Sequence, residues 1–476
     1  MLFSSVPFVF YFLPLFLVAY YLTGLRNSVL LVGSMFFYVW GEGPYVVLLL
    51  ALVAFNLAVG LRLERPDGRS RLLLLVFSII ANAAVLGFFK YSQFGLDIMA
   101  SVFHFKPATL SIHLPLGISF FTFQLMSYLI EVYRKAIPAE RDYLKLATYV
   151  MMFPHLVAGP IVRYTDIARE LGRRKMDVEK VGLGIQYFIV GLAQKVLIAN
   201  TVAGAADHVF GLPTDSISTS SAWLGTFAYT LQIYFDFCGY SNMAIGLAFL
   251  LGFRFPKNFD YPYSSRSISE FWRRWHMSLS FWFRDYLYIP LGGSRFGELK
   301  TIRNLAIVFL VTGLWHGAAW NFVFWGAFHG FFVIVEHIGL KKALDRAPQF
   351  ISRSYTLIVV MIGWVFFRAD SFTHAGKVIE AMAGFHGQSV WDPTPLWLTP
   401  EVIAAFIAGS IFSFPIVPWL LDKLGAEAVA GPSQHAKPGS VLAVHRIPTA
   451  ILLGSFVLSV MLLVSSSLNP FLYFRF

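Results

Sequence analysis

The sequence has very little charge. Of its 476 residues only 13% are charged, whereas 57% are hydrophobic and 17% are aromatic. Soluble domains carry about 25% charged residues, so this chain has too few polar groups to cover a globular surface of its size. Most of its outer surface must therefore face lipid, which indicates an integral membrane protein.

Cysteine is scarcer still. The single cysteine, Cys238, excludes an internal disulfide and any metal site built from several cysteines, so we predict no metal site.

Residues 1–25 carry no charged side chain, so the basic start of a cleavable signal peptide is missing. The formal net charge is +11, but the basic residues are spread between apolar runs. This pattern favours loops at an anionic cytoplasmic leaflet and argues against nucleic-acid binding.

The most prominent feature of the sequence is its long apolar runs. They are continuous, as in LLLLVFSIIANAAVLGFF (72–89), whereas the strands of a membrane barrel would alternate apolar and polar residues. With about 20 residues per crossing, they predict an all-α, polytopic membrane protein of about eleven transmembrane helices. Interfacial and re-entrant helices are expected to complete a central channel. The runs lie near 6–23, 28–61, 72–90, 114–132, 145–161, 182–200, 222–252, 304–335, 355–367, 402–421 and 448–466.

Three polar zones interrupt these runs. Residues 163–180 are typical of a short surface helix and loop, and residues 425–446 of a flexible connector. Residues 254–303 hold nine basic and four acidic side chains, so this zone is expected on the cytoplasmic side. Its core, SEFWRRWHMSLSFWFRDYLYIP (269–290), has helical aromatic spacing and predicts an amphipathic interfacial helix. His276 falls on its apolar side, where simple packing among aromatic rings is the alternative interpretation.

The apolar stretch TGLWHGAAWNFVFWGAFHG (312–330) holds two histidines, His316 and His329. It lies in an uncharged segment, residues 304–335, whose 32 residues would form a helix of roughly 48 Å. Because a hydrocarbon core is only about 30 Å thick, the segment must be tilted, broken or partly outside lipid. A break is expected at His316, between Gly313 and Gly317. A neutral histidine there could act as a base, or it could be a packed structural residue; His329 is expected to be supporting.

Several motifs in the sequence resemble the membrane-bound O-acyltransferase family, and within it the alginate O-acetylation branch. The resemblance covers nearly the whole chain and implies one membrane domain, 1–476, with N-terminal helices (1–135), a core (136–340) and C-terminal helices with an aromatic tail (341–476). The matching motifs are FPHLVAGPIVRY (153–164), FDFCGYSNMAIGLAFLLGF (235–253), NFDYPYSSRSISEFWRRWHMSLSFWFRDYLYIPLGGSR (258–295), GLWHGAAWNFVFWGAFHG (313–330) and NPFLYFRF (469–476).

The resemblance also implies roles for individual residues. His316 matches the family's principal catalytic histidine, and His276 matches a second polar site that is Asn in other branches. Tyr473, in the C-terminal aromatic motif, is implied as a transient acyl carrier, with an interfacial anchor as the equal alternative. Asn242 stands where an acidic residue is common in relatives. Asp236 is a possible partner for a histidine or a structural carboxylate.

Together these features predict an O-acetyltransferase of the bacterial inner membrane. It would take an acetyl group from a cytoplasmic thioester, with acetyl-CoA as the expected donor substrate, and pass it across the membrane. His316 would deprotonate the attacking hydroxyl, and His276 would orient a reactant or stabilise developing charge. Candidates for binding the donor's phosphates are basic residues of the 254–303 zone, although solvated loops explain them equally well: Arg273, Arg274, Arg284 and Arg295.

The chain has no large extramembrane domain to grip a polymer. Final transfer is therefore expected to fall to periplasmic O-acetyltransferase or acetyl-carrier subunits, with the polysaccharide as an indirect partner. Alginate is the first choice of acceptor, followed by cellulose or another exopolysaccharide, and then teichoic-acid D-alanylation. The alternatives from other classes are a non-catalytic transporter of a polymer or acyl carrier, and a scaffold. A transporter does not account for two histidines within Trp-rich motifs, and a scaffold predicts that replacing them leaves acetylation unchanged.

Overall fold

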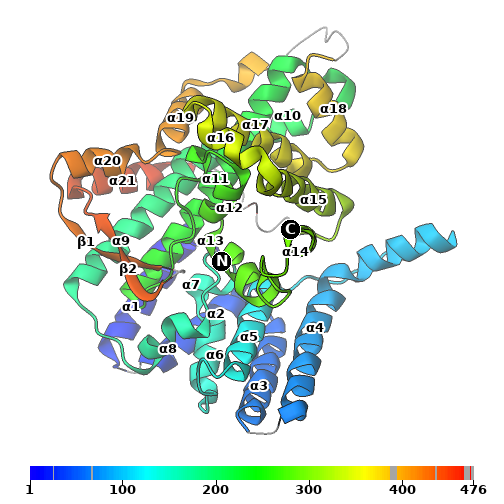
Figure 1. The fold of residues 1–476 in the computed structure, drawn as a ribbon. Helices are drawn as coiled ribbons and strands as arrows, with labels where there is room; N and C mark the ends of the chain where they lie inside the picture. Colours follow the sequence, from blue (N-terminus) through cyan, green and yellow to red (C-terminus); the bar gives the residue numbers. More distant parts are fainter. Residues whose placement is uncertain (25, 66–67, 386–393, 435–436, 466–471, 473–476) are drawn as a thin grey trace. The chain divides into compact units, whose positions relative to one another are not determined.

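The computed structural model describes the whole chain except residues 25, 66–67, 386–393, 435–436, 466–471 and 473–476. The described residues form helices joined by loops, together with one two-stranded sheet (Figure 1). The helical class expected from the apolar runs is confirmed. The chain divides into two compact units. Unit 1 comprises Met1–Ile185, Met243–Pro256 and Pro432–Ser440, and unit 2 comprises Gln186–Asn242, Lys257–Gly431 and Val441–Phe476.

Unit 1 is held together by aromatic rings and by a buried amide pair. The rings of Phe3, Phe8 and Phe153 pack against one another. Asn56 and Asn82 exchange two 3.0 Å hydrogen bonds between α3 and α4, a typical polar contact between membrane helices. Its helices are η1 (Pro7–Phe12), α1 (Leu13–Leu22), α2 (Arg26–Glu42), α3 (Tyr45–Leu63), α4 (Gly68–Phe103), α5 (Ile118–Tyr133), α6 (Tyr143–Met151), α7 (Phe153–Leu156) and α8 (Tyr164–Gly172).

Unit 2 contains the elements that build the candidate site. Helices α9 (Val178–Ala193) and α11 (Thr219–Leu250) begin or end in unit 1, and the sheet of β1 (Ala428–Gln434) and β2 (Lys437–His445) also has residues in both units. The other elements are η2 (Gln194–Asn200), α10 (Thr201–Phe210), η3 (Thr214–Ser216), η4 (Pro262–Ser264), α12 (Ile268–Arg274), α13 (Met277–Phe283), η5 (Arg284–Tyr288), α14 (Glu298–His316), α15 (Trp320–Val335), η6 (Glu336–Leu340), α16 (Lys341–Arg346), α17 (Gln349–Arg368), α18 (Phe372–Met382), η7 (Thr394–Trp397), α19 (Pro400–Phe412), α20 (Ile416–Lys423) and α21 (Thr449–Ser465).

Six helices among the described residues are long and apolar enough to cross a membrane, or seven if the bent pair α19–α20 forms one span. Three further apolar helices are shorter. The expected count of about eleven crossings is therefore not confirmed. One reason is visible at 145–161, where the apolar run forms α6 of nine residues and α7 of four. Neither approaches the roughly 20 residues of a full crossing. The connector expected at 425–446 carries β1 and β2 instead.

Helix α11 crosses the end of α9 and η2 at very short range. A Cβ on Gly239 would stand 2.6 Å from the carbonyl oxygen of Gly191, so only glycine allows this approach. Polar bonds accompany the crossing: Asn242 donates to Gln194 at 2.8 Å, and Lys195 pairs with Asp236 at 2.6 Å. Asp236 therefore has a lysine partner, and the interpretation that it serves a histidine is wrong for this structure.

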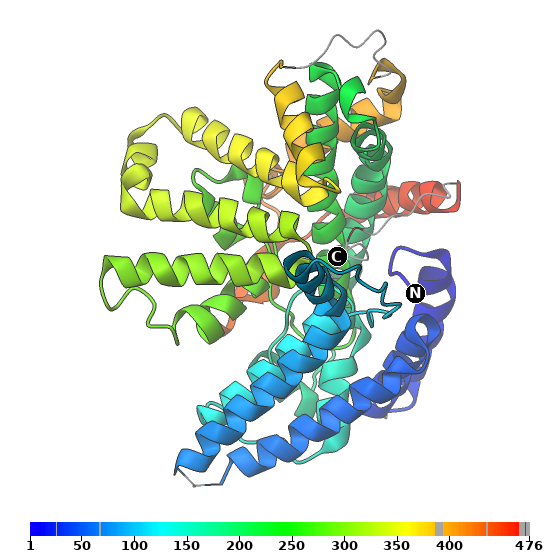
Figure 2. The ribbon, with the colours of Figure 1, turned by 90° about the vertical axis from the view of Figure 1, so that its right-hand side faces the viewer.

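Helices α14 and α15 form an antiparallel hairpin (Figure 2). A Cβ on Gly313 would lie 2.5 Å from the carbonyl oxygen of Phe322, and one on Gly326 would overlap the carbonyl oxygen of Phe309. Small residues at both positions let the two backbones touch. The over-long uncharged segment is thus two helices, and their junction directly follows His316. The expected break at this histidine is confirmed.

Candidate active site

His316 is the last residue of α14. The chain turns extended at Gly317 and restarts as α15 at Trp320. Gly317 is required here because a Cβ would overlap the ring of Phe322. The Nδ1 atom of His316 lies 2.7 Å from the carbonyl oxygen of Thr312, one turn earlier. A carbonyl only accepts, so Nδ1 carries the proton in the neutral ring and Nε2 carries the lone pair. That tautomer is the one a general base needs.

His276 also lies at a helix break. The single amphipathic helix predicted over 269–290 is wrong: α12 ends at Arg274, and α13 begins at Met277. Between them His276 adopts the left-handed conformation, with φ 41° and ψ 54°. Left-handed backbone is costly for residues with a Cβ and clusters at functional positions. The orientation of the buried His276 imidazole is therefore set by the break between α12 and α13, and a continuous helix would give it another orientation.

Asn258 holds the His276 ring. The backbone N–H of Ser278 donates to Oδ1 of Asn258 at 3.2 Å, which identifies this atom as the oxygen. His276 Nδ1 lies 3.2 Å from the same oxygen, so it is the donor and Nε2 carries the lone pair. Asn258 in turn donates to Ser241 on α11 at 3.0 Å. Both histidines therefore have the same tautomer, each fixed by an oxygen that accepts from Nδ1.

The ring of Trp315 neighbours both histidines. Its centroid lies 4.9 Å from that of His316 and 6.1 Å from that of His276. Trp325 covers another side of His316 at 4.9 Å, and Phe237 of α11 meets His276 edge-on at 4.7 Å. The structure thus brings the two predicted histidines into one aromatic enclosure. Rings of this size exclude water, which strengthens electrostatic interactions within the enclosure.

His329 also neighbours Trp325, and the centroids of the two rings lie 5.2 Å apart. It is fully buried among rings that include Trp272, Trp325 and Phe328. A Cβ on Gly363 would come within 2.6 Å of its Nε2, so α17 leaves just enough space for the imidazole. The supporting role expected for His329 fits this tight packing and stays a prediction.

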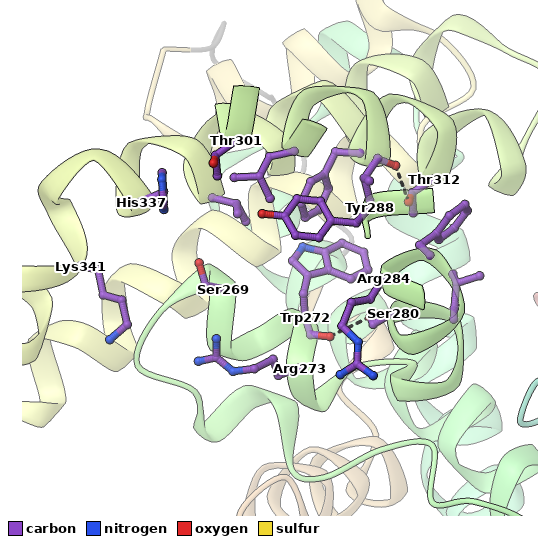
Figure 3. A pocket seen from close by; sticks show the side chains of 16 residues that line it. Ser269, Trp272, Arg273, Ser280, Arg284, Tyr288, Thr301, Thr312, His337 and Lys341 are labelled. Carbon is purple, nitrogen blue, oxygen red and sulfur yellow. Dashed lines mark hydrogen bonds between the residues drawn. The ribbon is translucent and has the colours of Figure 1, made fainter. Parts of the chain in front are cut away.

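A pocket of about 430 Å³ opens between α12, α13, η5, α14, α15 and the η6–α16 turn. Its apolar lining, or floor, includes Trp272, Phe309 and Val333, and Thr312 also lines the pocket. Figure 3 shows Arg273 and Arg284 on one side of Trp272, with His337 and Lys341 along the adjoining edge. The hydroxyl groups of Ser269, Ser280, Tyr288 and Thr301 also line it. Cations above an apolar floor suit a ligand with an anionic head and a slender, less polar arm.

The four predicted arginines divide into two pairs. Arg273 and Arg284 line the pocket, and Arg284 also pairs with Asp285 at 2.6 Å. Arg274, the immediate neighbour of Arg273, instead pairs with Glu270 at 2.8 Å and with Asp260 at 3.8 Å. Arg295 is exposed and does not line the pocket. The sequence analysis missed His337 and Lys341, although their i, i+4 spacing beyond an apolar run was a usable signal.

Glu336 was also missed, although it fixes one wall of the pocket. Its buried carboxylate accepts the backbone N–H groups of Ile268 at 2.6 Å and Ser269 at 2.8 Å, at the start of α12. The hydroxyl of Tyr355 donates to it at 3.3 Å. The carboxylate thus ties α12, which carries Trp272 and Arg273, to the end of α15. An acidic residue at the end of an apolar helix was the available signal.

Two further predictions concern Tyr473 and metal binding. Tyr473 lies outside the described residues. Among the residues that the structure describes, no group of three or more His, Cys, Asp or Glu side chains is arranged to hold a metal ion.

Comparison with known proteins adds independent information. The sequence profile described as MBOAT, the membrane-bound O-acyltransferase family, matches residues 132–373. The chain is 41% identical to a probable alginate O-acetylase of Pseudomonas putida, over the full length of both proteins. It is 35% identical to a peptidoglycan O-acetyltransferase of Helicobacter pylori, covering 82% of this chain and 81% of the relative. It is 30% identical to a teichoic acid D-alanyltransferase of Bacillus subtilis, covering 55% of this chain and 69% of the relative.

Proposed function

Because the chain belongs to the membrane-bound O-acyltransferase family and is a multi-pass membrane O-acyltransferase, we propose that it transfers acetyl groups from a cytoplasmic thioester to an acceptor across the bacterial inner membrane. Acetyl-CoA is the proposed donor. Membership of an enzyme family sets the transporter and scaffold alternatives aside. The proposed acceptor pathway is O-acetylation of an exopolysaccharide.

The observation that carries the proposal is the connection between the pocket and His316. Thr312 lines the pocket, and its carbonyl oxygen accepts from Nδ1 of His316. The floor residue Trp272 contacts Trp325, which in turn contacts His316. A donor whose phosphates met Arg273 and Arg284 could therefore extend its thioester arm over the apolar floor toward this histidine.

In the proposed reaction, Nε2 of His316 removes the proton of an acceptor hydroxyl as its oxygen attacks the thioester carbonyl carbon. The new C–O bond forms, and the carbonyl oxygen gains negative charge. Collapse of this intermediate breaks the C–S bond. The thiolate leaves and takes the proton back from the imidazolium, so the products are an acetyl ester and a free thiol. His276 would orient the acceptor or stabilise the developing charge.

Alginate is the proposed polymer, because full-length relatives are named for its O-acetylation. Cellulose or another exopolysaccharide is the second choice. We propose that the acetyl group passes to periplasmic O-acetyltransferase or acetyl-carrier subunits, which complete transfer to the sugar. Tyr473 is the proposed intermediate carrier within this chain.

The pocket predicts that Arg273 contributes to donor binding and that Arg295 does not. Arg273→Ala is expected to raise the acetyl-CoA concentration for half-maximal transfer about tenfold, since a hydrogen bond to a charged group contributes about 1.5–3 kcal/mol. Arg295→Ala, which removes an exposed cation outside the pocket, is the matched control and should stay within twofold of the parent. Both are measured by thiol release from acetyl-CoA by purified protein. Equal effects of the two variants would contradict the assignment of the pocket.

If Tyr473 carries the acetyl group, its hydroxyl should be acetylated during the reaction. When the chain is incubated with isotopically labelled acetyl-CoA and the downstream subunits are absent, acetyl-Tyr473 is expected to accumulate. Mass spectrometry of the C-terminal peptide detects it, and the label should be missing in the His316→Ala chain. Tyr473→Phe, which keeps the ring and removes the hydroxyl, is the companion variant. Full polymer acetylation by Tyr473→Phe would exclude the carrier role.

A further inference from the structure

The proposed mechanism makes no use of a second buried polar site in unit 2. Lys195 on η2 and Asp236 on α11 form a 2.6 Å ion pair with side chains 1% and 4% exposed. Lys195 also donates to Oδ1 of Asn200 at 2.8 Å. Both residues lie in helices long and apolar enough to cross a membrane. Burying two charges costs more desolvation than burying a pair of apolar residues would, so an ionisable pair within apolar helices of this kind indicates a functional role.

The carboxylate of this pair holds a residue from the end of the chain. One oxygen, Oδ1, meets Lys195, and the other, Oδ2, accepts the backbone N–H of Leu472 at 2.9 Å. The Leu472 side chain is itself only 4% exposed. The preceding helix, α21, packs against η2, the element that carries Lys195. Two separate parts of the C-terminal region thus meet the two elements that supply the ion pair: Leu472 meets α11, and α21 meets η2.

We propose that the Lys195–Asp236 pair is the docking site for the C-terminal segment of this chain. Lys195 neutralises the carboxylate and fixes its orientation, which leaves one oxygen aimed at a main-chain amide. The main-chain hydrogen bond holds Leu472 in place, and burial of its side chain determines which residue of the segment occupies the site. A charged acceptor makes this hydrogen bond stronger than one between neutral groups.

The docking site adjoins the candidate active site. Phe237 directly follows Asp236 on α11, and its ring meets that of His276 at 4.7 Å. The same turn of α11 therefore contacts the C-terminal segment and a proposed catalytic histidine. Tyr473 is the next residue after Leu472, so docking would register the proposed carrier. This last consequence rests on the proposed function, whereas the docking contact does not.

The test is amide hydrogen exchange at Leu472, measured by mass spectrometry on the full-length chain in detergent without donor. Lys195→Met/Asp236→Leu replaces the pair by apolar residues, a change that buried pairs often tolerate, and removes the acceptor. It is expected to speed exchange at Leu472 about tenfold or more. Lys195→Met/Asp236→Asn keeps a neutral acceptor and should fall between this variant and the parent.

The matched control is Asn242→Leu, which removes a polar bond at the same helix crossing but none to Leu472. It should exchange at the parental rate, as should His316→Ala. Parental exchange at Leu472 in a folded Lys195→Met/Asp236→Leu chain would overturn the docking site; if that chain does not fold, parental exchange in Lys195→Met/Asp236→Asn overturns it. Failure of the proposed acetyl transfer would instead appear as full activity of His316→Ala, with Leu472 still protected.

Discussion

Replacing His316 by alanine is expected to lower acetyl transfer by about a thousandfold, because a positioned general base contributes roughly 10²–10⁴ in rate. The ring is well placed for this role. Thr312 fixes its tautomer and also lines the basic pocket, and Trp315 and Trp325 enclose the ring. Removal of the side chain leaves the α14–α15 crossing intact, since that contact rests on Gly313 and Gly326.

The measurement is acetyl ester formed in cells and thiol released from acetyl-CoA by purified protein. His113→Ala is the control: His113 is 59% exposed and pairs with Glu42 in unit 1, so its loss should have little effect. Size-exclusion elution and the thermal midpoint in detergent should match the parent for both variants. Retention of a tenth or more of parental activity by His316→Ala would rule out its role as the base.

Changes at His276 are expected to separate backbone strain from chemistry. His276→Ala should lower activity about a hundredfold, within the range for removal of a group that stabilises developing charge. It should also lower stability by about 1 kcal/mol, because the hydrogen bond from the ring to Asn258 is lost. His276→Asn should keep most of the stability, since asparagine accepts this conformation, and should retain part of the activity through its amide.

His276→Gly completes the set. Glycine adopts φ 41° without strain but supplies no side chain, so it should be as inactive as alanine while remaining more stable. Initial rates and thermal midpoints of all three variants give the comparison. If His276→Gly were as active as the parent, the imidazole would have only a structural role, and the left-handed turn itself would be the essential feature.

The helical membrane class and the break at His316 could be predicted because both follow from large, local quantities. Too little charge and an uncharged segment too long for one crossing are countable in the sequence, and Gly313 and Gly317 mark the break. His276 shows the limit of the same reasoning. Its aromatic spacing fits one continuous helix, yet Asn258, which lies outside the predicted helix, binds its ring and the start of α13. Tertiary hydrogen bonds of this kind override periodicity.

The pocket shows a second limit. Arg273 and Arg274 are adjacent and chemically identical. Arg274 forms ion pairs because Glu270 and Asp260 lie next to it in the folded chain. Glu336 likewise gains its role from contact with the start of α12, 67 and 68 positions earlier in the chain. Composition identifies a basic zone, but the assignment of each side chain needs the packed helices.

The position of His316 at the end of α14 has an electrostatic consequence for the proposed reaction. The peptide dipoles of a helix add up to a partial negative charge at its C-terminus, and a cation there is stabilised by roughly 0.3–1 kcal/mol, or up to about 2 kcal/mol when partly buried. His316 is neutral until it removes the acceptor's proton, and it becomes a cation as the new bond forms. The backbone of α14 therefore favours the charged transition state over the resting enzyme, with no additional acidic side chain.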